Sequence, residues 1–160
     1  MTLENWHSNG WLRPHQTTPT QIAELLEIVD RDLEDAATAR LSPDWQFGIA
    51  YNAALKLCTI LLYAEGYRPE RNLAHYRTIQ AMPLILGSTR RNDADYLDTC
   101  RAKRNTAEYD VAGRISSEEA TELIAFTKEL HADTLSWLRG NHPNLVPLVA
   151  CSPSILLPTS

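Results

Sequence analysis

The segment from Pro43 to Glu65 constrains the fold more than any other part of the chain. Ser42 and Pro43 favour a helix start, because a serine side chain caps the first turn and proline suits the first helical position. The residues that follow are apolar on nearly every face of this helix: Ile49, Ala50, Ala53, Ala54, Leu57, Cys58, Ile60, Leu61 and Leu62. Because a helix that is apolar all round is buried on all sides, the pattern predicts a central helix surrounded by others.

Other segments show the helical patterns needed to surround such a centre. A helix start is expected at "TPTQ", residues 18–21, followed by an apolar stripe to Ala37 with acidic residues on its other face. Further helices are predicted at about 73–82, with Pro83 at its end; at 93–112, followed by Gly113; and from the capping box of Ser116 and Glu119 to near Gly140.

These patterns predict an all-α protein and no strands. We expect an antiparallel four- to five-helix bundle over residues 18–140, an N-terminal arm over 1–17, and a Pro-rich C-terminal tail over 141–160. The three cysteines are widely spaced and are interpreted as small buried apolar residues of a reducing compartment. With no signal-peptide pattern and no run of about 20 apolar residues, we expect a cytoplasmic protein without membrane contact.

The sequence offers little for a metal or a cofactor. Neither common form of the Gly-rich phosphate loop occurs. A di-metal bundle needs Glu-x-x-His on two helices, and the chain has that spacing once, at Glu4 and His7. We therefore expect no cofactor and no metal ion.

Basic residues concentrate in one part of an otherwise acidic chain. The formal net charge is −5, yet residues 68–114 hold nine Arg or Lys against six Asp or Glu, which gives this part +3 and the remainder −8. Solvated helix faces explain such a pattern, and so does a locally basic face that attracts phosphate. Arg90 is expected in a surface loop before a helix.

One basic residue stands on a stripe that otherwise predicts burial. Helical spacing places Leu97, Cys100 and Arg104 on one face of the segment that contains "RAKRNTAEYD", residues 101–110. An internal ion pair with Glu108 or Asp110 is one explanation for an arginine there. The other is a cleft in which the guanidinium binds phosphate.

The order of these parts resembles a HEPN domain, a helical bundle found in many prokaryotic toxin, antitoxin and phage-defence proteins. The resemblance covers roughly residues 20–138: an acidic helix, an alanine-rich helix, a short helix with "HYRTIQAMPLIL", and a helix with "RNTAEYD". Nuclease members carry an arginine, a polar residue and, four to six positions after the arginine, a histidine. Arg104 and Asn105 match the first two, and Tyr109 stands at the histidine position.

The resemblance implies a homodimer whose paired helices form a metal-independent RNA-cleaving cleft. It gives catalytic positions to Arg104, Asn105 and Tyr109, and phosphate contacts to Arg101, Lys103 and Arg104. A tyrosine with pKa near 10 is a poor base at neutral pH, whereas a histidine near 6.5 exchanges protons readily. The missing histidine therefore predicts a catalytically weak or inactive member.

Two functions follow from this reading. The first is a dimeric module that binds RNA, a nucleotide or a protein partner such as a nucleotidyltransferase, within a toxin–antitoxin or defence system. The second is an active metal-independent endoribonuclease that uses Arg104 with Asn105, Tyr109 or a histidine from elsewhere, such as His75.

Overall fold

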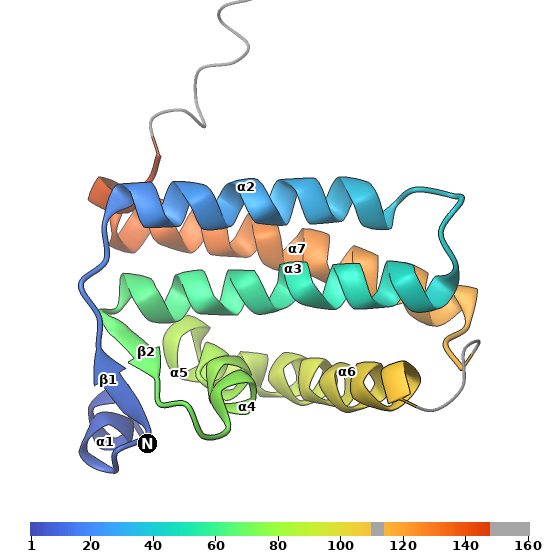
Figure 1. Cartoon of the computed structure of the whole chain (residues 1–160). Coiled ribbons are helices and arrows are strands. Elements are labelled where there is room, and N and C mark those ends of the chain that lie inside the picture. Colours follow the sequence, from blue (N-terminus) through green and yellow to red (C-terminus); the bar gives the residue numbers. More distant parts are fainter. Residues whose placement is uncertain (110–113, 148–160) are drawn as a thin grey trace, which may run out of the picture.

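The computed structural model describes residues 1–109 and 114–147, with the backbone alone at 107–109, and it is mostly helical. The elements lie in two layers (Figure 1). One layer holds the helices α2 (Pro19–Ala36), α3 (Pro43–Ala64) and α7 (Ser117–Asn141). The other holds α1 (Leu3–Ser8), β1 (Leu12–Pro14), β2 (Tyr67–Pro69), α4 (Ala74–Gln80), α5 (Met82–Leu86), the 3-10 turn η1 (Ser88–Arg90) and α6 (Arg91–Tyr109). A short 3-10 turn, η2 (Pro143–Leu145), follows α7.

The predicted central helix is confirmed as α3. Twelve of its residues are buried, including Phe47, Leu57 and Leu61, and all of them except Leu62 form the main core with the inward faces of α2, α6 and α7. By length and composition α3 also passes the test for a membrane span, but most of that stretch is buried inside the protein, as in a core helix of a soluble protein. Its burial is therefore explained by the packing around it.

The helix starts predicted from capping residues are also confirmed. Thr18 and Gln21 form a capping box at the start of α2, the Ser42 side chain accepts a hydrogen bond from the Trp45 backbone at the start of α3, and Ser116 forms a capping box with Glu119 at the start of α7. Each side chain satisfies backbone N–H groups that the helix itself leaves without partners. The proposed Gly113 cap and the tail from residue 148 lie outside the described residues.

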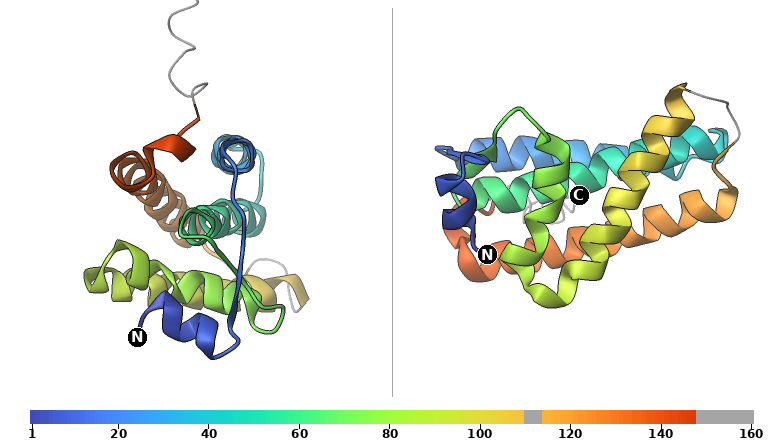
Figure 2. Two further views of the ribbon diagram at one scale, coloured as in Figure 1. Left: turned by 90° about the vertical axis from the view of Figure 1, so that its left-hand side faces the viewer. Right: turned by 90° about the horizontal axis from the view of Figure 1, so that it is seen from below.

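The helix directions differ from a simple alternating bundle. The helix α2 runs antiparallel to α3 and α7, whereas α3 and α7 run in the same direction (Figure 1). The chain returns between α3 and α7 through α4, α5 and α6, and α6 crosses beneath α3 (Figure 2). The helix expected over about 73–82 is shorter, as α4, and Pro83 lies in the first turn of a second short helix, α5, instead of ending the first.

The expectation of no strands was wrong. The strands β1 and β2 pair antiparallel, with Leu12 opposite Pro69 and Pro14 opposite Tyr67. Each strand has three residues and ends at a proline, so neither shows the alternating pattern of a longer strand. The pair holds the N-terminal arm against the end of α3, where Leu3, Trp6 and Leu12 form a second core with Leu62 and Ala81.

Arg90 is more than a loop residue. It ends η1, and its guanidinium donates to Asp133 of α7 at 2.7 Å and to Asp93 of α6 at 3.3 Å. The bond to Asp133 is the main cause that raises the pKa of Arg90. Arg90 therefore ties the two layers together, which its sequence position did not indicate.

Candidate phosphate-binding site

Arg104 fits into the α3–α6 interface because α3 offers it a glycine and an aromatic ring. Leu97 and Cys100, two turns and one turn earlier on α6, are 0% and 3% exposed, whereas Arg104 is half-buried. Its Cζ atom lies 5.4 Å from the ring centroid of Tyr51, and its Nε atom lies 3.8 Å from where a Cβ atom on Gly48 would be. The guanidinium thus lies on the face of an aromatic ring, which attracts cations.

Tyr51 places a polar group beneath this arginine. The residue is 1% exposed, and its hydroxyl makes no hydrogen bond with any residue that the structure describes. Burial raises the pKa of Tyr51 to about 12, against the opposing effect of Arg101 and Arg104. The hydroxyl therefore keeps its proton at neutral pH and is able to donate a hydrogen bond.

Arg101 extends the site toward α4. It lies one turn before Arg104, its Nε atom donates to Asp98 at 2.8 Å, and its Cζ atom lies 6.0 Å from the ring centroid of Tyr76. An open pocket of about 310 Å³ is formed here by Arg71, Leu73, Ala74, His75, Tyr76 and Arg101. We call it the α4 pocket.

His75 is exposed on α4 and lies within electrostatic reach of three cations. Its pKa is lowered first by the partial burial of its ring, and then by the positive charges of Lys56, Arg104 and Arg101. Lys56 comes from α3, so three helices bring these groups together. We call Lys56, His75, Arg101 and Arg104 the cationic site.

The cations of this site differ in their acidic partners among the described residues. Asp98 pairs with Arg101, but Lys56 makes no ion pair with any residue in the described part of the chain. The acidic residues gather elsewhere, because α2, in the other layer, carries six Asp or Glu and one Arg. The acidic residues of α2 thus belong to a different layer from the basic residues of α4 and α6.

The turn before α4 has an unusual backbone. Leu73 has φ 58° and ψ 32°, and it is the one residue other than glycine with positive φ among those described. Its side chain is 54% exposed and lines the α4 pocket. A leucine in this left-handed conformation costs roughly 1–2 kcal/mol, and such strain is often found at functional sites.

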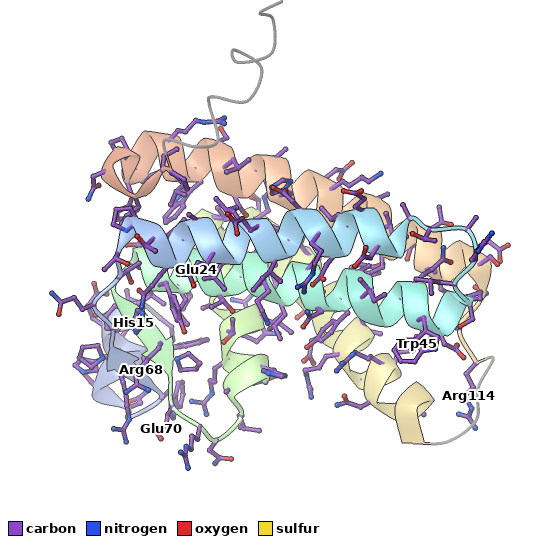
Figure 3. The ribbon with its side chains drawn as sticks, turned by 45° about the horizontal axis from the view of Figure 1, so that its top comes forward. His15, Glu24, Trp45, Arg68, Glu70 and Arg114 are labelled. Carbon is purple, nitrogen blue, oxygen red and sulfur yellow. The ribbon has the colours of Figure 1, made fainter. Side chains whose placement is uncertain are left out.

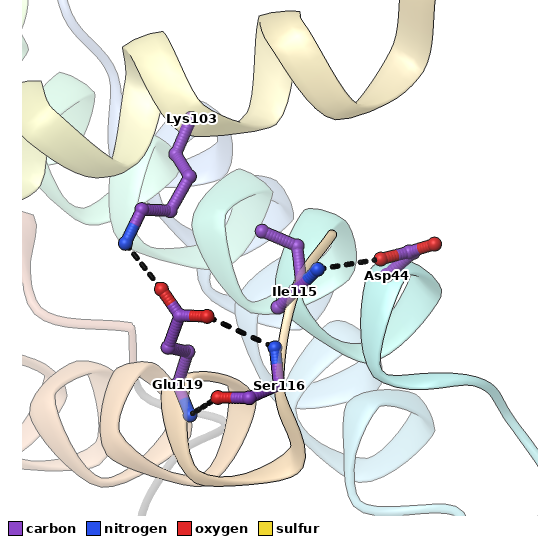
Figure 4. Close-up of polar contacts among 5 residues, drawn as sticks. All are labelled: Asp44, Lys103, Ile115, Ser116 and Glu119. Carbon is purple, nitrogen blue, oxygen red and sulfur yellow. Dashed lines mark hydrogen bonds and ion pairs between the residues drawn. The ribbon is translucent and has the colours of Figure 1, made fainter. Parts of the chain in front are cut away.

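The structure separates Lys103 from the other predicted phosphate contacts. Its ammonium group forms an ion pair with Glu119 of α7 (Figure 4). Glu119 also accepts a hydrogen bond from the Ser116 backbone at 2.9 Å, so Lys103 secures the start of α7. The bond between Lys103 and Glu119 is the main cause that raises the pKa of Lys103 and lowers the pKa of Glu119. The nearby Ile115 backbone donates to Asp44 at 3.2 Å, which anchors the same turn to α3.

The other sequence-predicted residues lie along the same helix. Asn105 is exposed on α6. Tyr109 is the last residue of α6, and its side chain, like those of Glu108 and Asp110, lies outside the described residues. The ion pair proposed between Arg104 and either acid is therefore not described.

Three residues of the site were missed by sequence reasoning: Tyr51, Lys56 and Tyr76. The sequence held a signal for Lys56, because it is the one basic residue of α3, a largely apolar helix. A charged residue on a buried helix has to reach the surface or a partner. The two tyrosines gave no such signal, since aromatic residues are common in helical cores.

Within the described ranges, His, Cys, Asp and Glu do not gather into any group of three or more that is suited to a metal ion. Comparison of this chain with family models, curated proteins and solved structures gives no match.

Proposed function

We propose that this protein binds the phosphate groups of RNA or a nucleotide at the cationic site. The observation that carries the proposal is the open pocket lined by His75 and Arg101, with Lys56 and Arg104 near enough to His75 to lower its pKa. Like charges at close range repel one another, so an anion in their midst gains attraction from each of them. Arginine suits phosphate because its planar group donates two parallel hydrogen bonds.

The buried hydroxyl of Tyr51 supports the same proposal. A buried hydroxyl without a hydrogen-bond partner is unfavourable, and few occur in folded proteins. Tyr51 has no such partner among the described residues and lies beneath Arg104. Because Arg104 covers this hydroxyl, a phosphate oxygen would accept its hydrogen bond once the Arg104 side chain moves outward to bind the anion.

We further propose that the chain is a HEPN-like module that forms a homodimer. The support is the order of the helices and the Arg104–Asn105 pair followed by Tyr109. In a toxin–antitoxin or defence system such a module binds RNA, or a partner such as a nucleotidyltransferase. Light scattering at micromolar concentration tests the dimer, and a monomeric mass would contradict it.

Two lysine variants test phosphate binding. Lys56→Ala removes a member of the cationic site, whereas Lys103→Ala removes a lysine that is paired with Glu119. Binding of a fluorescein-labelled single-stranded RNA, followed by anisotropy, should weaken in Lys56→Ala and stay near wild type in Lys103→Ala. Equal affinities for wild type and Lys56→Ala would contradict the proposed site.

A second function, metal-independent RNA cleavage, is favoured by the position of His75. The histidine lies near Arg101 and Arg104, and its lowered pKa favours the neutral form that accepts a proton at pH 7. In such a reaction the ribose 2′-hydroxyl attacks the adjacent phosphorus, and the 5′-oxygen leaves. His75 would take the proton of the 2′-hydroxyl, the arginines would stabilise the negative charge on the nonbridging phosphate oxygens, and the leaving oxygen would gain a proton from water.

A gel assay of RNA cleavage with EDTA present tests this second function. A positioned acid–base group contributes typically ~10²–10⁴-fold to rate. If His75 supplies it, wild type cleaves RNA, and His75→Ala and Arg104→Ala both lose that activity. If the Tyr109 position supplies it, wild type is inactive and Tyr109→His gains activity. Cleavage that survives both His75→Ala and Arg104→Ala would place the reaction elsewhere.

A further inference from the structure

A second pocket adjoins the α4 pocket and has a different chemistry. Its volume is about 300 Å³, and it is lined by Met1, Trp6, Trp11, Tyr76, Arg77, Gln80, Leu84 and Arg91. We call it the tryptophan pocket. Tyr76 lines both pockets, so they are neighbours on the surface of α4.

Flat groups line this second pocket. The Cζ atom of Arg77 lies 4.0 Å from the ring centroid of Trp11, so the guanidinium is in close contact with the ring. Trp6 meets Trp11 edge to face, with ring centroids 5.7 Å apart, and is 8% exposed. The ring of Trp11 is thus held from one side by the second core and carries Arg77 on its face.

Positive charge that no described acidic residue pairs with extends into the same pocket. Arg77 and Arg91 line it, and neither forms an ion pair with a residue in the described ranges. Gln80 adds an amide that both donates and accepts hydrogen bonds. Aromatic rings, arginine planes and an amide together suit a flat, polar, aromatic group attached to a negatively charged chain.

We propose that the tryptophan pocket binds a nucleobase of single-stranded RNA whose phosphate lies in the cationic site. This rests on the proposed function and specifies its ligand. Unpaired bases stack on aromatic rings and on guanidinium planes, and they form hydrogen bonds through their edges. Tyr76, 38% exposed between the two pockets, offers a further stacking surface. Bases inside a duplex are already stacked and paired, so the pocket selects single strands.

Three ligands separate base binding from phosphate binding: a single-stranded RNA hexamer, the same ribose-phosphate chain without bases, and the RNA hexamer paired in a duplex. All carry a fluorescein label, and anisotropy gives their affinities. Stacking contributes about 1–3 kcal/mol per base, which corresponds to roughly 5- to 150-fold in affinity. Wild type should therefore bind the RNA hexamer at least about fivefold more tightly than the chain without bases or the duplex.

Two variants test the pocket itself. Arg77→Lys keeps the charge but removes the planar group, and Tyr76→Ala removes the exposed ring. Each should weaken binding of the RNA hexamer by at least about fivefold. Arg77→Lys should also leave binding of the base-free chain within about twofold, whereas Tyr76→Ala is judged on the hexamer alone because its ring also contacts Arg101. Trp45→Ala is the matched aromatic control, because Trp45 is 67% exposed and lies in the first turn of α3. In Figure 3 it lies far from Arg68 in β2 and from Glu70, which follows β2.

The outcomes distinguish this inference from the proposed function. If the RNA hexamer and the base-free chain bind equally, or if Arg77→Lys and Tyr76→Ala bind RNA as wild type does, the base site is contradicted while phosphate binding stands. If wild type binds none of the three ligands, the proposed function itself is contradicted. A loss in Arg77→Lys that affects the hexamer but not the base-free chain supports the base site.

Discussion

The guanidinium of Arg104 lies over the ring of Tyr51, with its Cζ atom 5.4 Å from the ring centroid. This contact answers the question that the sequence raised about an arginine on an apolar stripe. The aromatic face of α3 accommodates the cation, and Gly48 leaves room for its Nε atom. The arginine therefore remains in the helix interface, and its charge, like those of Lys56 and Arg101, lowers the pKa of His75.

The first prediction concerns the hydroxyl of Tyr51. Tyr51→Phe should raise the free energy of unfolding by about 1 kcal/mol, because it removes a buried polar group that no described residue satisfies. The same variant should bind RNA more weakly if the hydroxyl donates to a bound phosphate. Urea denaturation of the two proteins measures the stability effect, and a loss of more than 1 kcal/mol would show that the hydroxyl has a stabilising partner.

The second prediction concerns Arg104 itself. Arg104→Ala should lower the free energy of unfolding by about 1–2 kcal/mol, since the variant loses both the cation–π contact and the packing of the long side chain. Arg40→Ala is the control, because Arg40 is exposed in the turn after α2, where changes usually stay within about 0.5 kcal/mol. Thermal melts of both variants compare them, and equal melting temperatures would refute the distinction.

Much of the fold was predictable because its signals are local. Capping residues and apolar periodicity depend on neighbours in the chain, so the starts of α2, α3 and α7 followed from Thr18, Ser42 and Ser116. The strands were not predictable in the same way, because β1 and β2 are three residues each and are far apart in the sequence. The partners of Arg90 were hidden for the same reason, as Asp133 lies 43 positions away.

The candidate site shows the same division. Arg104 was a candidate because of its place on a helical stripe. Arg101 was a candidate because it lies three residues before Arg104 in the segment that resembles the HEPN motif. Sequence proximity also suggested Lys103, but two residues along a helix turn a side chain to a different face, and Lys103 reaches Glu119 instead. Lys56 and Tyr76 join the site through the packing of α3 and α4 against α6, which the sequence of one helix does not specify.

The third prediction tests the strained turn before α4. Leu73→Gly should raise the free energy of unfolding by roughly 0.5–1 kcal/mol, because glycine adopts positive φ without the steric cost that leucine bears. Little packing is lost, since the leucine side chain is 54% exposed. Chemical denaturation measures the change. A destabilised variant would show that the exposed side chain stabilises the fold in some other way.

The fourth prediction concerns the titration of His75. Burial and nearby cations lower its pKa below 6.5, so its contribution to stability is present above pH 6.5 and is lost as the pH falls through the folded-state pKa. A bound phosphate should reverse the shift, because a negative charge favours the imidazolium form. NMR titration of the imidazole protons, assigned with His75→Ala, checks both statements. A pKa above 6.5 in the RNA-free protein would contradict the described environment.

The salt dependence of RNA binding tests the central claim most directly. If Lys56, Arg101 and Arg104 each neutralise one phosphate of a single strand, the logarithm of the association constant should fall with the logarithm of salt concentration with a slope of about −2. Lys56→Ala should make the slope shallower by about 0.7, and Lys103→Ala, whose lysine is already paired with Glu119, should leave it unchanged. A wild-type slope near zero, or equal changes in the two lysine variants, would contradict phosphate binding at the cationic site.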